Sequence, residues 1–315
     1  MDLILSRPTK PKIFLFGACD LYQAVNIDTI RKDFVIDAMP KGLSEIDHID
    51  FSMGIKPKFS TSMLSMYTKP NEIANRVHDS LYNKLNLKKY HFELNREILK
   101  FSYLKYFAES AGPNDILVMN LSSELYTKIQ VKSEIFTAIP ILSDSNVNDP
   151  DDVLHWLYKE YLTKEVYQVP FDNEESVNDT YLLLKDFARD IYEIFQDRVI
   201  IVRTHMTDLA LTKFNKVEKI QVPLEGTVPF YKTSKIMQAP VDHTYAVRLM
   251  NLFVNKFKLW YKEDIPVVTL DGPVFVDINH PLGYAPFHLH TISNYKLGLN
   301  IYKELNKMKN KRVHI

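Results

Sequence analysis

Four short apolar runs, set among longer stretches of helical periodicity, restrict the fold of this chain more than any other feature. The runs lie at 13–16, 34–39, 116–121 and 198–204. A run this short, apolar at successive positions and bordered by turn residues, is typical of a strand buried on both faces of a parallel sheet. Elsewhere, apolar residues recur at spacings of three and four over 71–87, 95–111, 150–162, 176–197, 242–262 and 291–309. Strands alternating with helices predict an α/β protein, a three-layer sandwich with a mainly parallel central sheet.

The length of the chain bounds its domain organisation. A chain of 315 residues, 46% of them apolar, can build one large domain with a substantial core. We predict a single domain with insertions over residues 1–315 rather than two domains, and the proline-punctuated segment 220–241 is its least regular part. The N-terminus lacks a signal-peptide pattern, and no stretch of ~18 apolar residues follows. The sequence therefore predicts a cytoplasmic protein without a membrane span.

Charge and glycine content argue against several classes of ligand. Lys and Arg together number 39, as do Asp and Glu, so the net charge is zero and no basic field attracts nucleic acid or anionic lipid. The chain has 8 glycines and contains neither G-x-G-x-x-G nor G-x-x-x-x-G-K-[ST], which argues against a Rossmann dinucleotide site or a P-loop. Its one cysteine cannot form an internal disulfide, so the thiol is left for chemistry.

Polar residues follow two of the predicted strands. Cys19 comes shortly after the first run and Asn120 ends the run at 116–121, so both fall at carboxyl ends of strands, where functional groups gather in open α/β sheets. Cys19 is interpreted either as a nucleophile or as an inert, packed thiol. Asn120 is either a donor to an oxyanion, together with backbone N–H groups near Ala18, or a turn or cap residue.

The segment DINHPLGYAPFHLH, residues 277–290, supplies the partners that a nucleophile needs. A neutral imidazole can accept the thiol proton, and a carboxylate can orient the ring and stabilise its charged form. Cys19, His280 and Asp277 therefore have the residue types of nucleophile, base and orienting group. We favour His280 over His288 as the base because the three-residue spacing returns the carboxylate to His280, whereas two prolines separate His288 from it.

Two other interpretations involve neighbouring residues. The histidines of the same segment, His280, His288 and His290, are of the type that binds metals, but no H-x-x-x-H or cysteine pair accompanies them, so we predict no metal site. Arg203 and His205 stand at the end of the run at 198–204 and can bind an anionic group of a substrate. The alternative is that Arg203 forms a salt bridge and that His205 is an ordinary surface histidine.

Three blocks together resemble the SGNH/GDSL hydrolase superfamily, and most closely a branch found in bacterial capsule and surface-polysaccharide gene clusters. The first block of that branch reads F-G-S-C and stands here as FGAC, residues 16–19. Its serine-rich segment resembles FSTSMLSMYTKP, residues 59–70, with Ser62 in a matching place. Its last block reads D-P-N-H-x-x-G-x-x-P-F-H-Y and corresponds to residues 277–290. Departures from the branch are Ala18 for Ser, Ile278 for Pro, Leu289 for an aromatic residue and Asn120 where Asp is common.

The resemblance implies acyl transfer, with acetyl passing from coenzyme A to a sugar hydroxyl of a polysaccharide precursor. It implies Cys19, His280 and Asp277 as catalytic residues. We predict a role in substrate or oxyanion binding for Asn120, Ala18, His288, Ser62 and Arg203, the last from its place at the end of a strand. An esterase that delivers the acyl group to water is the alternative within the same chemistry. A non-catalytic binding module of the polysaccharide pathway is the alternative outside it, favoured by the substituted first block.

Overall fold

The computed structural model describes residues 10–17, 19–37, 103–122, 128–131, 135–137, 166–169, 174–203, 205–211, 216–219, 243–278 and 288–313. At several positions within helices and strands, Cys19 among them, this description covers the backbone alone. All structural statements below concern these residues.

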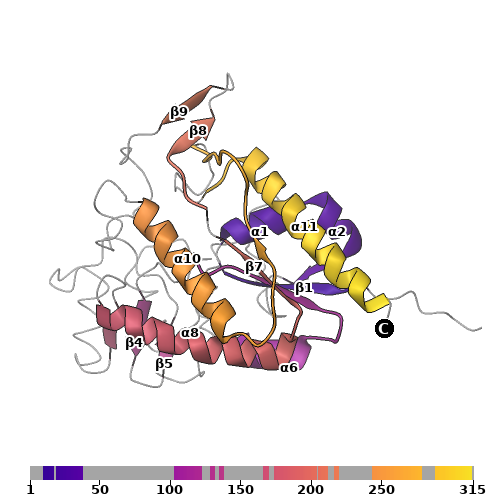
Figure 1. The fold of residues 1–315 in the computed structure, drawn as a ribbon, viewed down its shortest axis with the longest axis vertical. Coiled ribbons are helices and arrows are strands. Elements are labelled where there is room, and N and C mark those ends of the chain that lie inside the picture. The colour runs from indigo at the N-terminus through magenta and orange to yellow at the C-terminus, as the bar shows by residue number, and fades with distance from the viewer. Residues whose placement is uncertain are drawn as a thin grey trace, which may run out of the picture.

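A five-stranded parallel sheet forms the centre of the described structure (Figure 1). Its strands, in chain order, are β1 (Lys12–Phe16), β2 (Val35–Asp37), β3 (Ile116–Met119), β7 (Val199–Val202) and β10 (Val267–Val268). In space they run β10-β7-β3-β1-β2, so the direction in which the sheet grows reverses between β1 and β3. The predicted parallel sheet is therefore confirmed, and each of the four apolar runs contributes one strand to it.

Helices cover both faces of the sheet (Figure 1). One face packs against α6 (Tyr103–Ser110), α8 (Glu174–Phe195) and α10 (His243–Trp260), and the other against α1 (Cys19–Val25), α2 (Asp28–Asp33) and α11 (Thr291–Val313). The alternation of strand side chains explains the division, because Phe14 and Phe16 join the first cluster while Ile13 and Leu15 join the second. The chain thus has the three layers expected of an α/β sandwich.

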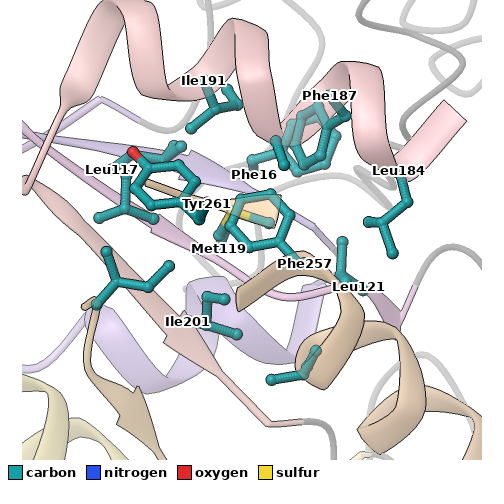
Figure 2. Packing of buried hydrophobic residues seen from close by; sticks show 14 of the residues in the cluster. Phe16, Leu117, Met119, Leu121, Leu184, Phe187, Ile191, Ile201, Phe257 and Tyr261 are labelled. Atoms are coloured by element: carbon teal, nitrogen blue, oxygen red, sulfur yellow. The ribbon is translucent and has the colours of Figure 1, made fainter. Parts of the chain in front are cut away.

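The helices are held on the sheet by apolar stripes of helical period. On α10, Met250, Phe253, Val254 and Phe257 are all buried at spacings of three and four, as an amphipathic helix requires. Figure 2 shows Phe187 and Ile191 of α8 and Phe257 of α10 packed over Leu117 and Met119 of β3. Burial of each such side chain contributes roughly 1.5–3 kcal/mol, so this face is a main source of stability.

Two smaller sheets accompany the central one. The strands β4 (Lys128–Val131), β5 (Ile135–Thr137) and β6 (Val166–Val169) form an antiparallel sheet in the order β5-β4-β6. The strands β8 (Leu209–Leu211) and β9 (Val217–Lys219) form an antiparallel pair after β7. Neither sheet was predicted from the sequence, because strands of three or four residues leave little periodic pattern.

The predicted helices at 176–197, 242–262 and 291–309 are confirmed as α8, α10 and α11, and α6 lies within the prediction at 95–111. The predictions for 71–87, 150–162 and 220–241 fall outside the described residues. Among the helices that the structure describes, none is long and apolar enough to cross a membrane.

Candidate functional site

The carboxyl ends of β1 and β3 meet at the point where the strand order reverses, and Gly17 and Asn120 lie there side by side. The backbone N–H of Asn120 donates to the Phe16 carbonyl over 2.9 Å. Gly17 has a φ of +142°, a value that side chains disfavour, and a Cβ on it would lie 2.1 Å from the Asn120 Oδ1 atom. Only glycine therefore allows the amide of Asn120 to sit against the end of β1.

The amide of Asn120 is held in a fixed orientation. Asn120 is 1% exposed, and its Oδ1 accepts a hydrogen bond of 2.8 Å from the buried hydroxyl of Ser122. Because the oxygen faces Gly17 and Ser122, the amide nitrogen is the donor end of the side chain. Asn120 is thus a buried residue, and its orientation is compatible with donation to an oxyanion at this edge of the sheet.

Cys19 is the first residue of α1, two residues after Gly17. The expectation that Cys19 follows the carboxyl end of β1 is confirmed for its backbone, while its side chain, like the whole of Ala18, lies outside the described part of the chain. Ser62 and His280 also lie outside the described residues.

The two ends of the segment 277–290 pair with each other beside the β8–β9 hairpin. Val276 forms an antiparallel bridge with Leu289 and a parallel bridge with Ala210. The Asp277 N–H donates to the His288 carbonyl and the His290 N–H donates to the Phe275 carbonyl, each over 2.8 Å. The backbones of Asp277 and His288 are therefore neighbours, so their separation along the chain is not a separation in space.

The amide of Asn294 ties this segment to α1. Its Nδ2 donates to the Leu289 carbonyl over 2.8 Å and to Oε1 of Gln23 over 3.1 Å. Gln23 lies one turn after Cys19 on α1, hence on the same face and about 6 Å away along the helix axis. Residues 288–290 are thereby held next to the helix that Cys19 begins.

A close approach of α11 to α1 supports the same arrangement. A Cβ on Gly298 would lie 2.3 Å from the Ala24 carbonyl oxygen, so the backbones of the two helices nearly touch at this point. The absence of a side chain at Gly298 is what allows the start of α11 to lie against α1.

The described histidines have different environments. His288 is buried, with 2% of its surface exposed. Nδ1 of His290 accepts from the Ile292 N–H over 3.3 Å, which gives His290 the role of a cap at the start of α11. Among the described residues, no three His, Cys, Asp or Glu side chains are grouped so that they could hold a metal ion.

Arg203 and His205 lie beyond the carboxyl end of β7. Nε of Arg203 is buried and has no hydrogen-bond partner among the described residues, which costs about 1–3 kcal/mol for a polar group left unpaired. Nε2 of His205 accepts from the Leu270 N–H over 3.1 Å. Burial, reinforced by the Arg203 charge and opposed by Asp271, lowers the pKa of His205 from 6.5 to about 4, so its ring is neutral at pH 7.

Comparisons of the chain with models of protein families, with curated proteins and with solved structures find no match. Sequence reasoning missed Ser122, Gln23 and Asn294, which position other groups of the site. Nothing in the local sequence distinguishes them from ordinary polar residues, whereas Gly17 stands out as part of the FGAC block and as the turn residue that ends the first apolar run.

Proposed function

We propose that this chain is an acyltransferase of SGNH-like fold that transfers acetyl from coenzyme A to a sugar hydroxyl in bacterial surface-polysaccharide biosynthesis. The strand order is that of flavodoxin-like doubly wound sheets, in which ligands bind outside the carboxyl ends of the strands where the order reverses. Gly17 and Asn120 occupy that position, and Cys19 follows directly.

The hydrogen bonds of Asn294 carry the proposal. They join residues 288–290, which include the rival base His288 and pair with the backbone of Asp277, to α1, one turn from Cys19. The described end of the last block, residues 288–290, thus lies beside the helix that begins at Cys19, although the two are more than 250 residues apart in the chain. A Cys-His-Asp site needs such a meeting of distant segments, whereas a packed thiol has no need of it.

The chemistry proceeds by two acyl transfers. The Cys19 thiol loses its proton to the histidine base, and its sulfur attacks the thioester carbonyl of acetyl-coenzyme A. The tetrahedral oxyanion is stabilised by the Asn120 amide and by backbone N–H groups at the start of α1. Collapse leaves acetyl on Cys19, and the coenzyme A thiolate takes the proton from the base. The sugar hydroxyl then attacks the new thioester, giving its proton to the same base, and the thiol is regenerated.

His280 is the proposed base, with Asp277 holding its ring, and His288 is the rival. Because the backbone of Asp277 pairs with that of His288, His288 is also a candidate base, and a comparison of the two histidine variants decides between them. We expect His280→Ala to lower turnover at least ~100-fold, a loss typical of a missing general base, and to slow alkylation of Cys19 at neutral pH. His288→Ala should mainly affect substrate binding. The reverse result would assign the base to His288.

The single cysteine makes the main test clean, because every thiol adduct is an adduct of Cys19. Intact mass spectrometry after mixing with acetyl-coenzyme A should show one acetyl group on the wild type and none on Cys19→Ala. Loss of the acetyl group to water without an added sugar would show an esterase. A thiol that reacts with neither acetyl-coenzyme A nor an alkylating reagent until the chain is denatured would overturn the proposal in favour of a binding module.

A further inference from the structure

Two arginines border β7, and only one of them is fully engaged. Before the strand, Arg198 donates to the carbonyls of Gly112, Asp115 and Ile194 over 2.6–2.9 Å. After it, the Arg203 backbone N–H donates to the Val268 carbonyl, but the Arg203 side chain forms no hydrogen bond or ion pair with any residue in the described part of the chain, and its Nε is buried. A guanidinium placed with an enclosed, unpaired N–H group is suited to an anion that the described residues do not supply.

The register of the sheet places Arg203 on the same edge as the proposed acyl-transfer site. Phe16 pairs with Met119, and Met119 pairs with Ile201. Arg203 follows two residues after Ile201, two strands across from β1, which is about 10 Å at the usual spacing between strands. That distance fits one substrate molecule with its reacting group at the start of α1 and an anionic group at Arg203.

The neighbours of Arg203 favour a ligand oxyanion. His205 is neutral at pH 7, and because its Nε2 accepts from Leu270, its Nδ1 carries the proton and is a second donor beside the arginine. Asp271 acts on His205 electrostatically but is exposed and forms no ion pair with Arg203. The part of Arg203 that is open to solvent leaves a route for a ligand.

We propose that Arg203 forms an anion subsite that binds a phosphate group of the substrate. The proposal rests on the acyl-transfer function for the identity of the substrate, since both coenzyme A and a phosphorylated sugar carry such a group. A guanidinium binds phosphate through paired N–H donors, and lysine cannot reproduce that geometry. The subsite would act on binding and leave the acyl-transfer chemistry to the residues near Cys19.

Inorganic phosphate is the first probe, measured by calorimetry and by thermal unfolding against chloride at equal ionic strength. We expect Arg203→Gln to weaken phosphate binding at least ~10-fold, the loss of one charge-assisted hydrogen bond, and Arg203→Lys to restore it only in part. Arg189→Gln is the matched control, because Arg189 is an exposed arginine of α8 paired with Asp186 and Asp190. Equal phosphate binding by the wild type and both glutamine variants, or none by any of them, would overturn the subsite.

A second measurement needs no variant. Phenylglyoxal modifies accessible arginines, and peptide mapping should show that phosphate protects Arg203 but not Arg189. Protection of both or neither would count against the subsite even if Arg203→Gln failed to fold.

The source of the phosphate is distinguished by competition. Coenzyme A and glucose 1-phosphate are each titrated against bound phosphate, and the one that displaces it in the wild type but not in Arg203→Gln is the class that the subsite binds. Displacement by neither would overturn the assignment to substrate. Cys19→Ser should bind phosphate like the wild type. The two proposals can therefore fail separately: an unreactive Cys19 with normal phosphate binding would refute acyl transfer alone, and acetylation of Cys19 without phosphate binding would refute the subsite alone.

Discussion

Replacement of Gly17 by alanine tests the junction between β1 and β3 most directly. The φ of Gly17 is +142°, and holding a residue with a side chain in such a region costs about 1–3 kcal/mol. The new Cβ would also lie 2.1 Å from Oδ1 and 2.8 Å from Cγ of Asn120, which is far closer than van der Waals contact. Asn120 must therefore move and lose its bond from Ser122, and a buried group left unpaired costs about 1–3 kcal/mol more. We expect a total loss of about 2–6 kcal/mol.

Two variants separate the backbone cost from the contact with Asn120. Gly272 has a φ of +85° and open space where a Cβ would stand, so Gly272→Ala should show the backbone cost alone, about 1–2 kcal/mol. In an Asn120→Ala background the nearest clashing atoms are gone, so Gly17→Ala should cost about 1–3 kcal/mol less than in the wild type.

Urea unfolding followed by circular dichroism and tryptophan fluorescence measures these free energies, provided that the slope with denaturant is unchanged among the variants. If Gly17→Ala costs no more than Gly272→Ala, and the same amount with and without the Asn120 side chain, the close approach at the strand-order reversal does not exist. The position proposed for the Asn120 amide as oxyanion donor would then be wrong as well.

Three further predictions concern α11, its anchor and His205. Gly298→Ala should destabilise the protein in urea, because the new Cβ would lie 2.3 Å from the Ala24 carbonyl oxygen. This is the opposite of the effect in an isolated helix, which alanine stabilises by about 1 kcal/mol relative to glycine, so a gain in stability would contradict the contact. Asn294→Ala should cost about 1–3 kcal/mol and speed hydrogen exchange at the His290 amide; unchanged exchange would remove the anchor. The pKa of His205 is about 4 in the folded protein instead of 6.5, so as the pH falls the unfolded chain takes up this proton before the folded protein does. The free energy of unfolding should therefore fall by about 3 kcal/mol between pH 6.5 and 4. His205→Gln keeps an acceptor for the Leu270 N–H and should remove that loss.

The parallel sheet was predictable because its central strands β1, β3 and β7 are buried on both faces, which makes them apolar at nearly every position. The smaller elements were not: α1 spans two helical turns, and β10 is a pair of valines after Pro266. A pattern of period 3.6 needs about three turns before it stands out from chance. The same limit explains why FGAC was recognised as a block while the helix that begins at Cys19 was not.

The residues that position the site were beyond sequence reasoning for another reason. The contact of Gly17 with Asn120 depends on the register of β1 against β3, and the Asn294 bonds depend on the packing of α11 against α1. Register and packing belong to the tertiary structure, so no local pattern encodes them. The spacing of Asp277 and His280 suggested that these two residues work as a pair. The backbone pairing of Asp277 with His288 makes His288 a candidate for the same role.

The two ends of the sheet differ in how fully their buried polar groups are paired. At the amino end, the Asp115 carboxylate accepts from the Lys12 and Gly112 N–H groups over 2.8 Å, and Arg198 uses its donors on backbone carbonyls. Among the described residues, the only buried side-chain nitrogen and oxygen atoms without a partner are Nε of Arg203 and Oδ1 of Asn294. Arg203 follows the carboxyl end of β7, and Asn294 joins residue 289 to α1. Each unpaired group costs free energy, and both lie toward the edge of the sheet at which we propose that the substrate binds, so the proposal offers a physical reason for their place.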